Sequence, residues 1–391
     1  MNLEQVDFLT QPHIQQLLES LHITEQNHLQ TAAKLSKNWT VDQVHALIET
    51  VILRQRAKKK FTKADQMLFT RSALEQASSE EVSAYRANKF SNANLSHIAD
   101  LCCSIGGDAI SLTQHAAVVG VDIDPIRLAM AEHNLAVYGK GSQFRVVQAD
   151  LNSFSPISEA DGFFFDPARR TAQGKRIFKL SEYKPSIEII DRWINQTSSG
   201  GIKISPGVDY SELPSPDLAS VEFLSVSGEV REAILWYGAL RSQSARSATL
   251  LPGNHQLANQ PEQPNPTVTP PKTWLYEPDG AVIRAHLIKE LAAEIDGSQI
   301  DSSIALLTTD SYRATSFARA FEIFDYFPFQ LKNLRRYVRE QKIGRVTIKK
   351  RGSPIDPQWL EKQLKPKGSK SAVLFLTQAA GKPIVIVCNM A

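Results

Sequence analysis

Four aspartates stand at the ends of successive apolar segments in the first half of this 391-residue chain. They are Asp100 in HIAD, Asp122 in VVGVD, Asp150 in VVQAD and Asp166 in GFFFD. A single aspartate after a strand is usually a turn former or a helix cap, but four in strand order favour a common site. Because the carboxyl ends of parallel strands meet at one edge of an open sheet, we expect these carboxylates to line one crevice there.

The segment after Asp100 reads LCCSIGGDAI and is rich in small residues. Small residues let the backbone turn tightly into a helix and approach a ligand closely. We therefore predict that this loop contacts a cofactor through Cys102, Ser104, Ile105 and Gly106.

The next two acidic positions fit the other parts of a nucleoside. Asp122, followed by Ile123, ends the second predicted strand, where its carboxylate can accept hydrogen bonds from both hydroxyls of a ribose. Asp150, followed by Leu151, ends the third, where it can accept a hydrogen bond from the exocyclic amine of an adenine. We predict that these four residues bind the nucleoside of the cofactor.

A nicotinamide cofactor would also favour an acid after the second strand, so a dehydrogenase is the alternative to consider. A dinucleotide normally needs the GxGxxG pattern, which leaves a helix N-terminus open to a pyrophosphate. Here Cys102, Ser104 and Gly106 occupy the corresponding loop. S-adenosylmethionine has no phosphate and carries a sulfonium cation, so it suits an acidic loop better.

The elements that would carry these residues change in character near residue 93. No glycine occurs before Gly106, and Pro12 is the only proline before Pro125, which is typical of helices. Residues 1–92 are therefore predicted to form a helical domain. Over residues 93–252, short apolar runs alternate with helical stretches, which predicts an α/β domain with a Rossmann-like parallel sheet. A turn at Ser227 and Gly228 suggests a hairpin that closes it.

The last third of the chain has a different composition. Residues 253–272 are rich in proline, glutamine and asparagine, and are predicted to be a linker. Residues 273–391 combine helical runs with the strand-like segments SAVLFLTQ and KPIVIVCN, which predicts a small α+β domain. The whole chain has a net charge of +3, but residues 332–370 alone carry about +10.

Several of these segments together resemble a known family. DLCCSIGGDA, GVDIDPIRLAMAEHN, VVQAD and FFFDPARR look like the successive motifs of class I S-adenosylmethionine-dependent methyltransferases. VVGVDIDPIRLAMAEHNLAVYG is similar to trimethylguanosine synthase, and the layout resembles bacterial methyltransferases with a THUMP-like carboxy-terminal domain. The resemblance implies that Asp100 and the loop through Gly106 hold the methionine part of S-adenosylmethionine, that Asp122 holds the ribose, and that Asp150 holds the adenine.

The fourth motif, Asp166-Pro167-Ala168-Arg169-Arg170, departs from the nearest relatives. Enzymes that methylate exocyclic amines of bases usually have Pro-Pro and then an aromatic ring, which is missing here. The motif also resembles enzymes that methylate carbon 5 of uracil, but those need a cysteine after the next strand, and GIKISPGVDY has none. We predict that Asp166 and Pro167 lie closest to the chemistry, with Asp166 orienting a target amine. Arg169 and Arg170 are either substrate contacts or solvated loop charges.

The basic segments indicate a nucleic-acid partner, although a charge run is often only a solvated face. Tyr337 and Trp359 interleave with the charges of residues 332–370, a pattern that favours RNA binding. The expected contacts are Lys349, Lys350 and Arg351 there, and Arg86 and Lys89 just before the first predicted strand.

The sequence also disfavours several classes of protein. It has no run of about 18 apolar residues, no signal-peptide pattern and no cysteine or histidine spacing suited to zinc. We therefore expect a soluble, cytoplasmic protein without a metal or a membrane partner. The favoured function is methyl transfer to a nitrogen of a structured RNA. The alternatives are a methyltransferase acting on a protein or small molecule, and a non-catalytic RNA-binding protein that retains the cofactor pocket.

Overall fold

The computed structural model describes residues 1–24, 26–154, 159–168, 179–197 and 199–390, and it divides into two compact units. The amino-terminal unit comprises Met1–Ser220 and Ala233–Gln243, and the carboxy-terminal unit comprises Val221–Glu232 and Ser244–Ala391. The division crosses strands β6 (Ala219–Val226) and β7 (Glu229–Tyr237), which flank the expected turn at Ser227 and Gly228.

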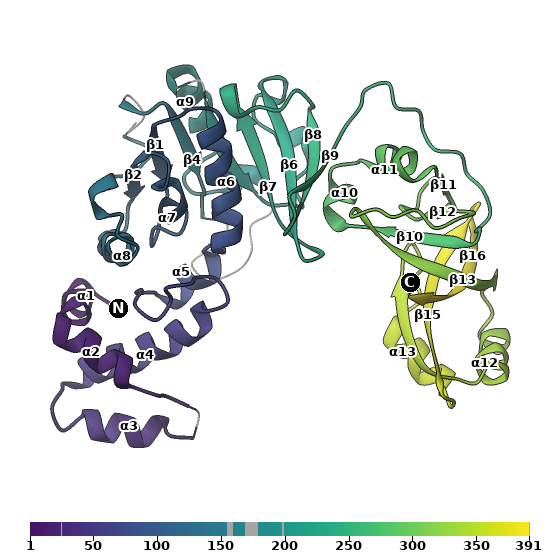
Figure 1. Ribbon diagram of the computed structural model, residues 1–391, viewed down its shortest axis with the longest axis horizontal. Helices are drawn as coiled ribbons and strands as arrows, with labels where there is room; N and C mark the ends of the chain where they lie inside the picture. The colour runs from purple at the N-terminus through teal and green to yellow at the C-terminus, as the bar shows by residue number, and fades with distance from the viewer. Residues whose placement is uncertain (25, 155–158, 169–178, 198, 391) are drawn as a thin grey trace. The chain divides into compact units, whose positions relative to one another are not determined.

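Helices form the first part of the amino-terminal unit, as the scarcity of glycine and proline predicts (Figure 1). Capping boxes at Asn2 and Thr40 start two of them, because each side chain accepts a hydrogen bond from the backbone N–H three residues later. The helices are α1 (Leu3–Thr10), α2 (Pro12–Ser20), α3 (His28–Leu35), α4 (Val41–Ala57), α5 (Arg71–Gln76) and α6 (Glu80–Asn92).

A parallel sheet follows, in the order β3-β2-β1-β4-β5, and β7 then pairs antiparallel to β5. The direction of strand addition reverses between β1 and β4, and the carboxyl ends of strands at such a point form the usual ligand crevice of an open α/β sheet. The strands are β1 (His97–Leu101), β2 (Ala117–Asp122), β3 (Phe144–Gln148), β4 (Gly162–Phe165) and β5 (Gly200–Ile204).

Helices cover both faces of this sheet. Phe90 of α6 contacts Phe164 and Trp236 on one face, whereas Trp193 of α9 contacts Phe163 and Phe165 on the other. This opposition follows from β geometry, because successive side chains of β4 point to opposite faces. The helices that follow strands are α7 (Ala109–Leu112), α8 (Pro125–Val137) and α9 (Ile189–Thr197).

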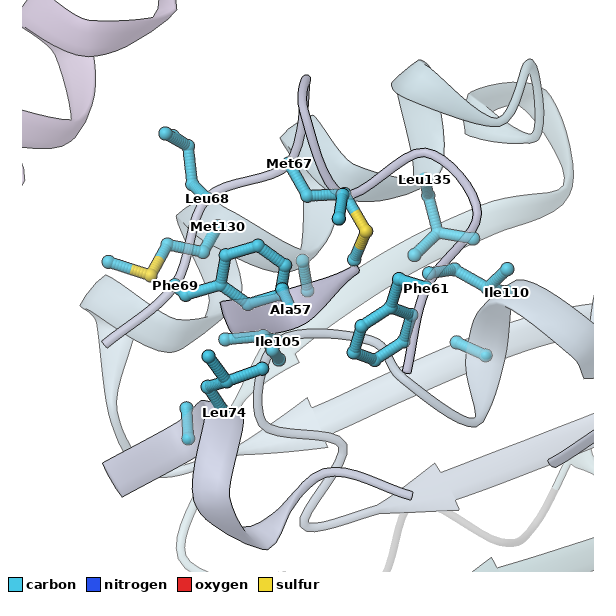
Figure 2. Packing of buried hydrophobic residues seen from close by; sticks show 14 of the residues in the cluster. Ala57, Phe61, Met67, Leu68, Phe69, Leu74, Ile105, Ile110, Met130 and Leu135 are labelled. Carbon is cyan, nitrogen blue, oxygen red and sulfur yellow. The ribbon is translucent and has the colours of Figure 1, made fainter. Parts of the chain in front are cut away.

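The amino-terminal helices share a hydrophobic core with the sheet unit. Figure 2 shows Phe61, Met67 and Phe69, from the segment between α4 and α5, close to Ile105 and Leu135 of the loop and helix that follow β1 and β2. A second link is polar, since Asn134 of α8 exchanges two hydrogen bonds with the backbone of Leu68. The predicted limits 1–92 and 93–252 therefore separate two kinds of secondary structure within one packed unit.

The carboxy-terminal unit contains β8 (Arg246–Leu251) and β9 (His255–Ala258), the latter within the segment expected to be a linker. Among the described residues, a second sheet runs in the order β11-β12-β10-β13-β16-β15-β14. Its strands are β10 (Trp274–Pro278), β11 (Ser298–Gln299), β12 (Leu307–Thr309), β13 (Ala318–Pro328), β14 (Ile343–Lys350), β15 (Lys370–Ala379) and β16 (Lys382–Met390). The helices are α10 (Gly280–Arg284), α11 (Ile288–Ile295), α12 (Leu331–Glu340) and α13 (Pro357–Leu364).

Candidate active site

The carboxyl edge of the first sheet collects the acidic residues predicted from the sequence. Asp100 is the penultimate residue of β1, Asp122 ends β2 and Asp166 directly follows β4, so they flank the point where strand addition reverses. Asp150 lies two residues beyond β3 and is exposed. Its Oδ1 accepts hydrogen bonds from the backbone and side chain of Asn152, so it also stabilises its own turn.

Asp100 is buried without a full set of partners. Its side chain is 1% exposed, and Oδ2 accepts no hydrogen bond from the residues that the structure describes. Burial raises the pKa of Asp100 well above its usual range, and the nearby charges of Asp108, Asp166 and Asp122 raise it further, whereas Arg86 opposes them. A buried carboxyl group in this position would be stabilised by a ligand that is positively charged or that donates a hydrogen bond.

Asp122 holds the loop that follows β1. Its Oδ2 accepts a hydrogen bond from the Ser104 backbone N–H at 3.0 Å, and its Oδ1 accepts one from the Asp124 N–H at 3.0 Å. Burial raises the pKa of Asp122, while these two backbone hydrogen bonds act in the opposite direction. Each carboxylate oxygen can accept a second hydrogen bond, so a role in binding a ribose is compatible with this structural one.

The loop itself needs small residues because of its backbone conformation. Cys102, Ser104 and Gly106 all have positive φ, at 63°, 51° and 79°. A Cβ at Gly106 would lie 2.6 Å from Cδ2 of Leu135 on α8, so a larger residue would displace that side chain as well as adopt an unfavourable positive φ. Ile105 is buried, and its carbonyl accepts a hydrogen bond from Asn134 Nδ2 at 3.1 Å. The loop is thus fixed on α8 and follows a course that brings main chain close to the sheet edge.

The apolar residues predicted to bind the nucleoside differ in accessibility. Ile123 is 64% exposed although it directly follows the buried end of β2, so it can offer an apolar surface to a planar base. Leu151 is buried next to the exposed Asp150. An exposed aliphatic side chain beside a carboxylate suits a nucleoside, whose base is largely apolar on its faces and whose ribose is polar.

The structure brings two buried cations to this edge, of which Lys203 was not predicted from the sequence and Arg86 was predicted as a substrate contact. Lys203 of β5 donates a hydrogen bond from Nζ to Asp166 Oδ2 at 2.6 Å. Arg86 of α6 is ion-paired with Asp108, and its guanidinium lies 4.8 Å from the centre of the Phe164 ring. The only sequence signal for Lys203 is a lysine inside the otherwise apolar strand GGIKI.

The charges of this cluster leave an excess of acid. Among the described residues, Asp100, Asp108 and Asp166 face two cations, Arg86 and Lys203. A low-dielectric site with one more carboxyl group than cations favours a cationic ligand, because such a ligand allows the remaining carboxyl group to ionise. S-adenosylmethionine carries a sulfonium and an ammonium group, and the unsatisfied oxygen of Asp100 is an acceptor for such a group. The residues present therefore fit this cofactor.

The substrate contacts predicted within this unit are only partly described. Arg169 and Arg170 lie outside the described residues. Pro167 is buried directly after Asp166, and Lys89 Nζ lies 4.6 Å from the centre of the Trp236 ring. Arg86 is buried in its ion pair with Asp108, a position that favours a structural role over contact with a large substrate.

The predicted RNA contacts of the carboxy-terminal unit fall into two environments. Lys349, near the end of β14, and Arg351, just past it, both form ion pairs with Glu277 of β10. The Arg351 Nη2–Glu277 Oε1 distance is 2.5 Å, and Lys350 between them is exposed. Three strands, β13, β16 and β15, separate β10 from β14 in the order of the sheet. These ion pairs therefore join segments of strands that are not neighbours, which gives Lys349 and Arg351 a contact within the sheet besides the RNA contact predicted for them.

Within the described residues, the three cysteines have neither the lowered pKa of a reactive thiol nor the grouping of metal ligands. Burial raises the pKa of the Cys102 and Cys103 thiols well above their usual range, and raises that of Cys388 to about 12. In the described ranges, no cluster of histidine, cysteine, aspartate and glutamate has a geometry suited to a metal ion. No helix in that same part of the chain has the length and apolar character needed to cross a membrane.

Comparison with protein families agrees with the motifs at the sheet edge. Residues 95–199 match the RNA cap guanine-N2 methyltransferase family, and residues 318–390 match the THUMP domain-like family. Among solved structures, a protein from Porphyromonas gingivalis W83 crystallised as a proposed methyltransferase superposes with a TM-score of 0.75. It is 19% identical, and the match covers 95% of this chain and 100% of that one, so the two share a fold.

The fold and the acidic sheet edge define a class I methyltransferase with a THUMP-like carboxy-terminal region. An uncharacterised S-adenosylmethionine-dependent methyltransferase of Mycobacterium tuberculosis is 34% identical over 86% of this chain and 93% of its own length. Trimethylguanosine synthase of Schizosaccharomyces pombe is 31% identical over 22% of this chain and 40% of its own length. The chain therefore belongs to the S-adenosylmethionine-dependent methyltransferases, and S-adenosylmethionine is its cofactor.

Proposed function

We propose that this methyltransferase transfers a methyl group to a nitrogen of a structured RNA. The observation that carries the proposal is Asp166, a partly exposed carboxylate that directly follows β4 at the carboxyl edge of the sheet, near the buried Asp100. The matches to the RNA cap guanine-N2 methyltransferase family and to the THUMP domain-like family support RNA as the substrate class. A cytoplasmic location is part of the same proposal.

We assign the cofactor contacts by position along the sheet edge. Asp100 and the loop of Cys102, Ser104, Ile105 and Gly106 would hold the methionine part, as the buried acceptor and the small residues suggest. The ribose contacts would be Asp122 and Ile123, and the adenine contacts would be Asp150 and Leu151.

The chemistry then asks little of the protein beyond alignment and exclusion of water. The bound cofactor supplies a methyl group on a sulfonium, which is already a good leaving group. Asp166 accepts a hydrogen bond from the target amine and so directs the nitrogen lone pair at the methyl group. The buried Pro167 restricts the backbone of the turn that carries Asp166. This is orientation and not proton abstraction, because the nitrogen becomes a strong acid only after the methyl group has arrived.

RNA affinity would come mainly from the basic residues 332–370 of the carboxy-terminal unit. Lys350 is exposed and can reach a phosphate, whereas Lys349 and Arg351 are already paired with Glu277. Trp359 is an exposed aromatic side chain among these charges and can stack on a base. Arg169, Arg170 and Lys89 are the proposed contacts nearer to the reacting group.

The experiment is methyl transfer from radiolabelled S-adenosylmethionine to total RNA from cells that lack the protein, followed by nucleoside analysis. A single N-methylated nucleoside is expected. Asp166→Ala should lower the single-turnover rate about a hundredfold at saturating cofactor and change cofactor affinity only a few fold. Asp161→Asn, at the opposite end of β4, is the matched control, and transfer by this variant should be near normal.

Other outcomes point to the alternative functions. The missing aromatic residue after Pro167 favours a protein or a small molecule as the acceptor, and label in either one with none in RNA would establish that class. Cofactor binding without any transfer would favour a non-catalytic RNA-binding protein.

A further inference from the structure

We propose that Lys203 is a positioning residue for methyl transfer, which, with Ser78, fixes the orientation of the Asp166 carboxylate. This inference rests on the proposed role of Asp166 in orienting the acceptor nitrogen. It adds to that role a lysine from β5 and a serine from the turn before α6.

The burial of Lys203 is difficult to explain by stability alone. Lys203 as a whole residue is 3% exposed, and every residue of β5 is buried. Moving an ammonium group out of water is costly, and apolar side chains of similar volume often replace a buried ion pair without loss of stability. A lysine within an otherwise apolar strand is therefore better explained by what its charge does to a neighbour.

The contacts of Lys203 define the direction of its ammonium group. Nζ lies 2.6 Å from Asp166 Oδ2 and 3.1 Å from Ser78 Oγ. The three side chains come from segments that are far apart in sequence, so their meeting is a property of the tertiary fold. With Nζ held by two oxygens, the Asp166 carboxylate has a fixed, charge-assisted donor on one of its own oxygens.

The position of the pair relative to solvent suits a supporting role. The Asp166 side chain is 22% exposed, whereas that of Lys203 is 4% exposed, so the lysine lies beneath the carboxylate. Asp166 also feels the negative charges of Asp100 and Asp108, which by themselves would push its carboxylate away from the cluster. The attraction of Lys203 opposes that repulsion and keeps one orientation.

The test compares Lys203→Met with Lys203→Arg in single-turnover transfer to total RNA at saturating cofactor. Lys203→Met should lower the rate at least about thirtyfold, because a loosely held orienting group loses alignment. Lys203→Arg, which keeps the charge, should recover part of that loss. Lys58→Met is the matched control, because it removes an exposed Lys–Asp pair of 3.1 Å in the same unit and should leave the rate unchanged.

A double-mutant cycle separates positioning from general stability. If Lys203 acts through Asp166, Lys203→Met should lower the transfer rate of the Asp166→Asn variant by less than about threefold. This is far less than the loss that Lys203→Met causes in the wild-type protein. Additive losses would overturn the inference, as would a near-normal rate in Lys203→Met. Should Lys203→Met fail to fold, Ser78→Ala provides the second variant. Ser78→Ala should lower the single-turnover rate about fivefold in the wild-type protein and should have no further effect in the Asp166→Asn variant.

The results also distinguish this inference from the proposed function. Normal transfer by Asp166→Ala would remove the role of Asp166 and the inference with it. A slow Asp166→Ala together with a normal Lys203→Met would overturn only the role of Lys203. A structure of Lys203→Met adds a measurement that needs no RNA, since the Asp166 carboxylate should occupy a different orientation from that in the wild type.

Discussion

Each unit has a buried carboxyl group beside cations, but the balance of charge is opposite in the two. At the sheet edge of the amino-terminal unit, three carboxyl groups face Arg86 and Lys203, and among the described residues Asp100 Oδ2 has no hydrogen-bond partner. In the carboxy-terminal unit, Glu277 alone faces Lys349 and Arg351. The first arrangement is incomplete without a cationic ligand, whereas the second is complete and joins two strands. Buried charge thus indicates a ligand site only when its partners do not satisfy it.

The sharpest test of this difference is the removal of one partner from each cluster. Arg86→Met leaves the largely buried Asp108 carboxylate without the cation that pairs with it, so the free energy of unfolding should fall by about 3 kcal/mol. Glu277→Gln leaves two cations that water partly reaches, and it should cost about 1–2 kcal/mol. Urea denaturation measures both values, and equal losses would contradict the comparison. Arg71→Met, which removes an exposed pair with Glu49, serves as the control.

Cofactor affinity should depend strongly on Asp122. Its carboxylate holds the Ser104 N–H and is assigned to the ribose hydroxyls, so Asp122→Ala removes a support of the loop and a ligand contact together. We expect at least a tenfold weaker affinity, from a loss of about 1.5–3 kcal/mol. Calorimetric titration with S-adenosylmethionine measures it, and unchanged affinity in a folded variant would rule out the ribose assignment.

Cofactor binding should also release a proton from Asp100. Burial and the charges of Asp108, Asp166 and Asp122 raise the pKa of Asp100 against the effect of Arg86, and a bound cation would lower it again. Affinity should therefore rise with pH until the raised pKa of the cofactor-free protein is passed, and stay level above it. Calorimetry in buffers of different ionisation enthalpy measures the number of protons released on binding. Asp100→Asn should abolish this release.

The smallest effect is expected on the salt dependence of RNA binding. Lys350 is exposed, whereas Lys349 is paired. Lys350→Ala should therefore reduce the slope of log affinity against log salt by about one, the value for the loss of one phosphate contact. Lys349→Ala should leave that slope nearly unchanged and lower the melting temperature instead. If both variants change the slope equally, the pairing of Lys349 with Glu277 does not persist when RNA binds.

The sequence predicts much of the sheet edge because its signals are local. An apolar run that ends in aspartate identifies a strand and the end that faces the crevice, which is sufficient to bring Asp100, Asp122 and Asp166 together. Glycine at position 106 follows from the same logic, since a positive φ is a local requirement.

The partners of these residues could not be found in this way. Lys203 and Ser78 are 125 residues apart, and Glu277 and Lys349 are 72 apart, and no periodicity in the sequence links either pair. Arg86 was expected at the mouth of the site because it just precedes the first strand, but its position on α6 turns it inward to Asp108. Such pairings depend on how helices pack on the sheet, which side-chain volumes decide collectively.

The shared core in Figure 2 has a consequence for how the chain is synthesised. Phe61, Met67 and Phe69 leave the ribosome before Ile105 and Leu135, against which they pack in the folded protein. At about 5–20 residues per second, the nascent helices wait several seconds for these partners. During that interval their apolar side chains are open to chaperones, so residues 1–92 made alone should associate or aggregate.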